Sequence, residues 1–183
     1  HKDNDGNGYQ GDVYGYNFVK NTGVISWDDV NDTGHGTHVA GVIAAQNDNG
    51  IGISSIAGGR GSIPGAKIMS CQIFSGSTAS NALATVKAIK YAADNGASIL
   101  QCSWGYPAGA VTTDNAYASG ARIEKQAIDY FIATKNNAVL DGGLVIFAAG
   151  NDAKAMSGYP GAYRDYISVT AFSPDYLPAY YTN

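Results

Sequence analysis

Four short apolar runs constrain the fold of this chain more than any other feature of its sequence. They read AKIMSCQIF, ASILQCS, GGLVIFAAG and YISVTAF, at residues 66–74, 97–103, 142–150 and 166–172. A strand made of such a run is apolar on both faces, so both faces have to be covered. Longer segments with helical periodicity separate the runs, at residues 36–46, 80–94 and 115–135. This alternation predicts a parallel α/β sheet with helices above and below it.

Charge and hydropathy argue against several classes of partner. The 183 residues carry a formal net charge of −4, with acidic and basic residues scattered along the chain. The sequence has no basic stripe that could bind nucleic acid and no polybasic patch that could bind a membrane surface. No apolar run approaches the roughly 20 residues of a spanning helix, and the first residues lack a signal-peptide core. We therefore expect one soluble domain over residues 1–183, with no nucleic-acid or membrane partner.

The two cysteines, Cys71 and Cys102, both lie inside predicted strands. A free thiol in such a place behaves as a small hydrophobic side chain. We therefore expect free thiols, with a disulfide between them as the alternative.

The residues that follow two of the predicted strands are the first candidates for a site. In parallel α/β sheets the ligand crevice lies at the C-terminal ends of the strands. One strand is followed by Ser103, Trp104 and Gly105, and another ends in Ala148, Ala149, Gly150 and Asn151. Bare backbone there can lie alongside an extended ligand, and an asparagine there can donate its amide to an oxyanion. A Gly-Asn pair after a strand is also typical of a simple turn.

Two histidines stand three positions apart in DTGHGTHVAG, where a predicted helix begins. A metal site formed by His35 and His38 would lack further ligands, because no HExxH-type pattern is present. Packing at a helix N-terminus is a second interpretation. A third is a general base held over the crevice, since imidazole can be neutral near pH 7.

Five segments of the chain together resemble one known family of proteins. In chain order they are DTGHGTHVAGVIAAQNDN, GAKIMSCQIF, ASILQCSWG, GGLVIFAAGND and YPGAYRDYISVTAF. They resemble the subtilisin-like serine proteases, or subtilases. The resemblance covers nearly the whole chain, and HGTHVAG is among the most specific signatures of the family. It implies a three-layer subtilisin-like α/β fold, a peptide or protein substrate, and a secreted or cell-envelope location of bacterial type. It also implies that His35 is the triad histidine, that His38 is structural and that Asn151 is the oxyanion-hole amide. Residues 103–105 and 148–150 would flank the substrate backbone and its main specificity pocket.

The chain departs from the subtilase pattern at the other two members of the triad. A VID[ST]G-like string with the aspartate and a GTS[MA] string with the serine are both absent. Asp28, Asp29 and Asp32 stand too close to His35 in sequence, and SGSTAS at residues 75–80 is typical of a helix cap. The chain therefore resembles the central part of a subtilase, incomplete at both ends. We expect segments with the aspartate and the serine to be its partners, and the chain alone to be inactive.

The first residues carry a separate metal-binding pattern. DNDGNGYQGD offers hard oxygen donors at alternate positions, with Gly6 and Gly8 available for tight turns. The expected ligands are Asp3, Asp5, Asn7, the carbonyl of Tyr9, and Asp12. The spacing resembles the front of an EF-hand-type loop, and similar loops followed by GYNFV occur in many bacterial subtilases, so we expect structural Ca²⁺. An acidic, glycine-rich surface turn is the alternative.

Other functions and the substrate preference stay open at this level. The chain could be a non-catalytic, calcium-binding remnant or structural module on a subtilase scaffold. A nucleotide-binding domain would have to use AGGRGSIPG, residues 57–65, which matches neither phosphate-binding fingerprint. Trp104 and Phe74 point to apolar substrate side chains, whereas Asp152 points to a basic one.

Overall fold

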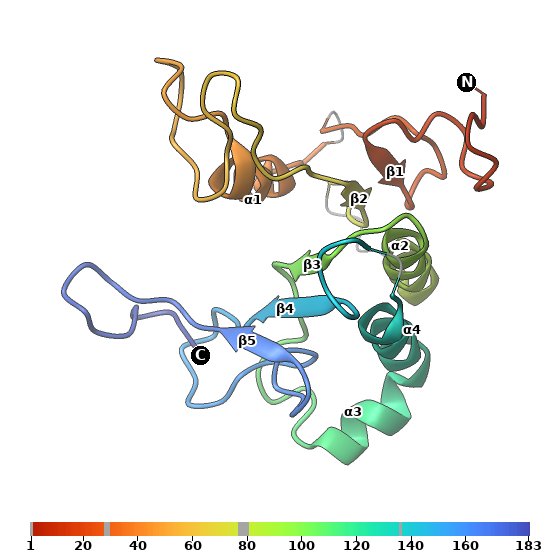
Figure 1. Cartoon of the computed structure of the whole chain (residues 1–183). Helices are drawn as coiled ribbons and strands as arrows, with labels where there is room; N and C mark the ends of the chain where they lie inside the picture. The colour runs from red at the N-terminus through yellow and green to blue at the C-terminus, as the bar shows by residue number, and fades with distance from the viewer. Residues whose placement is uncertain (1, 28–29, 77–80, 136) are drawn as a thin grey trace. The chain divides into compact units, whose positions relative to one another are not determined.

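The structure is a computed structural model that describes all residues except 1, 28–29, 77–80 and 136 (Figure 1). The elements, in chain order, are β1 (Gly15–Asn17), α1 (His35–Ala44), β2 (Ser70–Gln72), α2 (Ala82–Asp94), β3 (Ile99–Cys102), α3 (Asp114–Gly120), α4 (Arg122–Ala133), β4 (Leu144–Ala148) and β5 (Ile167–Val169). Across the described ranges, no helix combines the length and apolar content that crossing a bilayer requires. Asp28, Asp29 and Ser77 lie outside the described residues.

The chain divides into two compact units, His1–Ala88 and Ile89–Asn183. In the first unit, β1 and β2 pair in parallel, with Tyr16 opposite Cys71. The side chain of Asn17 is fully buried at the end of β1 and donates to Oε1 of Gln72 at 3.0 Å. This bond offsets the cost of removing the Asn17 amide from water, and it helps to fix the register of this short pair. That the two units form one domain stays a prediction.

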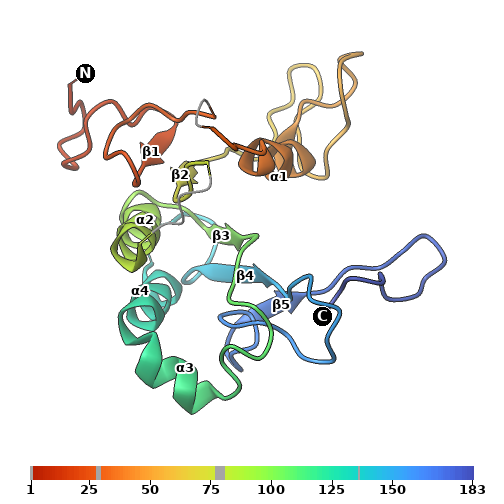
Figure 2. The same ribbon diagram turned by 180° about the vertical axis from the view of Figure 1, so that it is seen from behind.

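The second unit contains the three-stranded parallel sheet β3-β4-β5 (Figures 1 and 2). Helix α4 packs against β4 and buries Ile128 and Phe131, while β4 buries Val145 and Phe147. Parallel strands and helices thus follow from the apolar runs, as the sequence predicted. The corners that follow the strands of this sheet carry the candidate site.

Both cysteines are free thiols, as expected. Cys102 is buried at the end of β3, and burial raises the pKa of Cys71 to about 12. Since the thiolate is the reactive form, Cys71 is unreactive at neutral pH.

The segment predicted as one helix over residues 115–135 is two helices, α3 and α4. Helix α3 ends at Gly120, and Ala121 has φ −109° and ψ 34°, outside the helical region. Glycine loses the most backbone freedom in a helix, so the chain turns here at low cost. On a continuous helix Tyr117 and Glu124 would be about 10.5 Å apart along the axis. The turn brings Oη of Tyr117 within 3.0 Å of Oε1 of Glu124.

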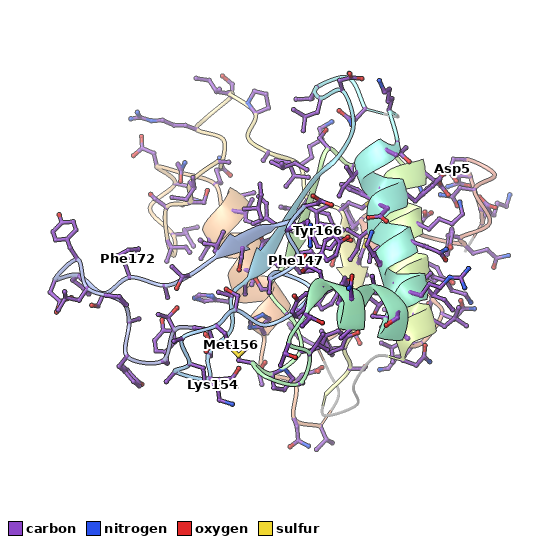
Figure 3. The ribbon with its side chains drawn as sticks, turned by 90° about the horizontal axis from the view of Figure 1, so that it is seen from below. Asp5, Phe147, Lys154, Met156, Tyr166 and Phe172 are labelled. Atoms are coloured by element: carbon purple, nitrogen blue, oxygen red, sulfur yellow. The ribbon has the colours of Figure 1, made fainter. Side chains whose placement is uncertain are left out.

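A buried carboxylate lies at the centre of this second unit. Glu124 accepts hydrogen bonds from the hydroxyls of Tyr117 at 3.0 Å and Tyr106 at 3.1 Å. Tyr117 also stacks on Tyr159, with ring centroids 5.3 Å apart, and Tyr166 lies 5.8 Å from Phe147 (Figure 3). Burial raises the pKa of Glu124, and the two phenol bonds offset only part of that rise.

Glu124→Gln is expected to change how stability depends on pH. The native state raises the pKa of Glu124 above that of the unfolded chain, where a glutamate has a pKa of about 4.3. The contribution of Glu124 to wild-type stability is therefore fully present below that unfolded pKa, and it is lost as pH rises through the native pKa. Glutamine has no titratable group, so the variant lacks this dependence of stability on pH. Urea unfolding of both chains from acid to neutral pH should show wild type losing stability relative to the variant as pH rises. A difference that stays constant with pH would contradict the assignment.

Candidate active site

His35 is the first residue of α1, in the first unit. The preceding Gly34 has φ 67° and ψ 13°, a left-handed conformation that glycine adopts without a steric penalty. Asp32 accepts a hydrogen bond from the backbone N–H of Gly76 at 2.5 Å. This bond joins the turn before α1 to the segment after β2. His35 lies on the first turn of α1 and is exposed.

His38 closes that first turn, because its backbone N–H donates to the carbonyl of Gly34 at 2.9 Å. Its side chain is exposed, like that of His35. Within the described ranges, no three His, Cys, Asp or Glu side chains gather as a metal-ligand set. The described residues therefore offer no set of three metal ligands at the two histidines, and the exposure of both side chains does not support the packing interpretation. The general-base role of His35 stays a prediction.

In the second unit, the two glycine-containing strand ends lie side by side. Cys102 pairs with Phe147 across β3 and β4, so Ser103 and Ala148 follow at the same edge of the sheet. The predicted substrate-binding residues of this unit, Ser103, Trp104, Gly105, Ala148, Ala149 and Gly150, are thus brought together. Bare backbone at two neighbouring strand ends can lie alongside an extended peptide.

A third segment, residues 158–160, fastens these two strand ends to each other. The N–H of Tyr106 donates to the carbonyl of Tyr159 at 2.6 Å, and the N–H of Gly158 donates to the carbonyl of Ala149 at 2.7 Å. A Cβ at Gly158 would overlap the carbonyl oxygen of Tyr106. These contacts join the strand ends backbone to backbone, at a spacing that only glycine permits at residue 158.

Asn151 follows this corner directly, after Gly150 with its φ of 116°. Asn151 is exposed, and its side-chain amide has no hydrogen-bond partner among the described residues. An oxyanion donor must be available in this way, since it serves only the charge that develops in the transition state. Asn151 belongs to the second unit and His35 to the first.

The residues around Asn151 are held by a side chain that the sequence did not single out, that of Asn183. Its Oδ1 accepts the N–H of Asp152 at 2.8 Å and of Lys154 at 3.2 Å, and its Nδ2 donates to the carbonyl of Ala149 at 3.2 Å. Asn183 is 31 residues beyond Asp152 in a tyrosine-rich segment, so no local pattern announces the contact.

The residues considered for substrate preference have other partners in the structure. Trp104 packs edge-on against the buried Phe147, with centroids 5.4 Å apart. The N–H of Ala108, and then the amide of Asn183, hold the pKa of Asp152 below its usual range. Phe74 is half-exposed in the first unit. Trp104 and Asp152 therefore support the shape of the corner, and neither a basic nor an apolar preference is favoured.

In the candidate calcium loop, Asp3 faces the backbone. Its two oxygens accept the N–H groups of Gly6 at 2.8 Å and Gly8 at 2.9 Å, at glycines with φ of 72° and 90°. The bond from Gly8 is the main cause that lowers the pKa of Asp3. Both glycines thus make the tight turns that the sequence predicted.

Two other predicted ligands of this loop, Asp5 and Asp12, converge on one point. Nδ2 of Asn7 donates to Oδ2 of Asp5 at 3.1 Å and to Oδ2 of Asp12 at 2.9 Å, while Oδ1 of Asn7 accepts the N–H of Tyr9 at 2.8 Å. Oxygen donors of this type suit Ca²⁺. In the structure the amide nitrogen of Asn7 lies between these two carboxylates, and no three His, Cys, Asp or Glu side chains of the described residues gather as a metal-ligand set. An ion there would need Asn7 and Asp3 to turn from their present partners.

The glycine-rich segment at residues 57–65 forms a tight turn. The N–H groups of Arg60 and Ile63 each donate to the other's carbonyl at 3.0 Å, and Arg60 pairs with Asp48 at 2.7 Å. A phosphate loop needs its backbone N–H groups for the ligand, so this arrangement disfavours nucleotide binding.

The sequence model of the subtilase family matches residues 1–183. Halolysin of Haloferax mediterranei is 34% identical over 169 residues, which cover 92% of this chain and 28% of halolysin. Thermitase of Thermoactinomyces vulgaris is 32% identical over 159 residues, which cover 87% of this chain and 47% of thermitase. The chain thus spans less than half the length of these relatives.

Solved structures show the same fold. Sphericase superposes with a TM-score of 0.61 at 25% identity, over 84% of this chain and 46% of sphericase. The prenylagaramide maturation protease PagA superposes with a TM-score of 0.60 at 26% identity, over 81% of this chain and 46% of PagA. These likenesses confirm the subtilisin-like α/β fold class that the sequence predicted.

Proposed function

The chain belongs to the subtilase family, and on this premise we propose that it supplies the general base, the oxyanion donor and the substrate-binding strand ends of a secreted or cell-envelope serine endopeptidase. The observation that supports this most is the backbone corner at residues 103–105 and 148–150, which leads directly to an exposed, unbonded Asn151. A peptide or protein substrate follows from the family. The complete protease of this proposal is the chain joined to segments that carry the triad aspartate and serine.

In the proposed reaction each residue of the chain has one task. His35 takes the proton of the serine hydroxyl as that oxygen attacks the peptide carbonyl, and returns it to the leaving amine. Asn151 donates its amide to the oxygen on which negative charge develops. The strand ends hold the substrate backbone, so that the carbonyl meets the nucleophile in a productive geometry.

Labelling with a fluorophosphonate, which reacts only with activated serines, tests this division of tasks. We expect the complete protease to be labelled and to hydrolyse peptides. The 183-residue chain should stay unlabelled, because it has no GTS[MA] string and His35 therefore has no nucleophile to activate. Stoichiometric labelling of the chain alone would mean that one of its own serines is the nucleophile. An unlabelled, inactive complete protease would instead favour the non-catalytic calcium-binding module.

Calcium at residues 3–12 is the second part of the proposal, supported by the convergence of Asp5 and Asp12. The ion would be held by these carboxylates, with Asn7, Asp3 and the carbonyl of Tyr9 as the other expected ligands. Added Ca²⁺ should raise the Tm of the chain, since a ligand of the native state stabilises it by about 2.7 kcal/mol at 100 times Kd.

A paired substitution makes the calcium test specific. Asp5→Asn with Asp12→Asn should abolish the shift in Tm. Asp48→Asn, which changes an exposed carboxylate of the same unit, should leave it intact. No shift in the wild-type chain at several millimolar Ca²⁺, about the weak end for extracellular sites, would rule the assignment out.

A further inference from the structure

The side chain of Asn183 acts as a clamp on residues 149–154, which include the proposed oxyanion donor. Its Oδ1 accepts two backbone N–H groups, from Asp152 and Lys154, and its Nδ2 donates to the carbonyl of Ala149 and to Oδ2 of Asp152. Its backbone N–H also donates to the carbonyl of Gly150 at 3.3 Å. The contacts lie on both sides of Asn151 in the sequence, so they define the conformation of the loop between them.

The clamp itself is held from outside the loop. The carbonyl of Asn183 accepts the hydroxyl of Thr170 at 2.9 Å, and Thr170 directly follows β5. Strand β5 pairs with β4, with Val169 opposite Ala148. Asn183 is thus attached to the same sheet whose strand β4 leads into the loop. This attachment fixes the position of its side chain relative to that strand.

The fit at Gly150 is close. A Cβ at this residue would overlap Nδ2 of Asn183, and the φ of 116° disfavours a side chain there. Asn151 is next in the chain, so a shift of the Asn183 amide moves the peptide that carries the oxyanion donor. Displacements of about 1 Å near a reacting centre can cost about 100-fold in rate.

We propose that Asn183 is a positioning residue for the oxyanion donor Asn151, acting through the 149–154 loop. The inference rests on the proposed function, because Asn151 has its assigned task only in a protease. Asn183 acts through its hydrogen bonds to the loop, and the proposal gives it no contact with the substrate. Ala149 keeps its backbone bonds to Val169 and Gly158 when the Asn183 side chain is removed. The loss of that side chain should therefore lower kcat through Asn151 and leave substrate binding at the strand ends largely intact.

A double-mutant cycle in the complete protease tests this coupling. Asn183→Ala should lower kcat at least about tenfold, with KM changed by less than about twofold, as expected for an interaction made only in the transition state. In an Asn151→Ala background the same substitution should lower kcat no further. An unchanged kcat, or an equal loss in both backgrounds, would overturn the proposal. If Asn183→Ala does not fold, Asn183→Asp, which keeps the size and the oxygen acceptor, carries the same cycle.

Asn137 provides a matched control in the same unit. Its Oδ1 accepts the N–H groups of Val139 and Leu140, and its Nδ2 donates to the carbonyl of Gly142. It is thus a similar amide clamp on a loop without any proposed site residue. Asn137→Ala should leave kcat unchanged. A loss of kcat equal to that of Asn183→Ala would mean that general loosening of the unit, and not positioning, causes the effect.

Hydrogen exchange on the 183-residue chain separates this inference from the proposed function. In Asn183→Ala the amides of Asp152 and Lys154 should exchange faster than in wild type, and in Asn137→Ala they should not. If the complete protease proves inactive while exchange changes as expected, the proposed function fails and the clamp remains. If the protease is active and these amides exchange equally in Asn183→Ala and in wild type, the positioning inference is wrong and the proposed function stands.

Discussion

Replacement of His35 by alanine is expected to lower kcat of the complete protease by about 10⁶, the loss found in subtilisin, another member of this family, when its triad histidine is removed. The reason is that the serine hydroxyl is a weak nucleophile until a neighbouring base accepts its proton. The residual rate would come from binding and from the oxyanion donor. Hydrolysis of a chromogenic peptide, followed to saturation, gives kcat and KM separately.

The second histidine provides the control for this prediction. His35 accepts the serine proton in the proposed reaction, so His35→Ala should lose most of the rate. His38→Ala should keep most of it, because the contribution of His38 to the first turn of α1 is a backbone bond. The reverse pattern would show that His38 is the base.

The sequence predicted the order of the main elements better than their number or extent. The apolar run at residues 66–74 contains a strand of only three residues, β2, and the run at 142–150 contains the five residues of β4. Apolar character alone does not set burial or length, since Ile167 and Val169 of β5 are 42% and 54% exposed. A strand extends only as far as a partner is available to pair with it. For the same reason β1 was not expected, since three residues, GYN, form no apolar run.

The helices show a similar limit. Periodicity carries through Gly120 and Ala121 because the apolar faces of α3 and α4 both contribute to one core, around Tyr117, Ile128 and Phe131. The break between them depends on the cost of helical glycine and on the bond from Tyr117 to Glu124. A bond between side chains on two different helices has no signature in either helix alone.

Within the candidate site, the sequence identified residues that belong to specific strings and missed those that act through tertiary contacts. HGTH and AAGN are local patterns, and His35 and Asn151 could be read from them. Residues 158–160 and Asn183 join the site by backbone and amide bonds across the fold. Residues 158–160 act through backbone groups that almost every residue has, and the side-chain amide of Asn183 acts on a residue 31 positions away, so only the folded structure selects them.

Asn151→Ala is the other substitution with a large expected effect, a fall in kcat of the complete protease by about 10²- to 10³-fold, the range measured for the oxyanion asparagine of subtilisin itself. KM should change little, because the amide is aimed at charge that is absent from the bound substrate. Steady-state kinetics on one peptide, together with Tm, distinguish this result from a loss of folding. Asn151 is exposed and unbonded among the described residues, so its removal should leave Tm unchanged. A rise in KM at constant kcat would instead assign Asn151 to substrate binding, and the oxyanion would need a different donor.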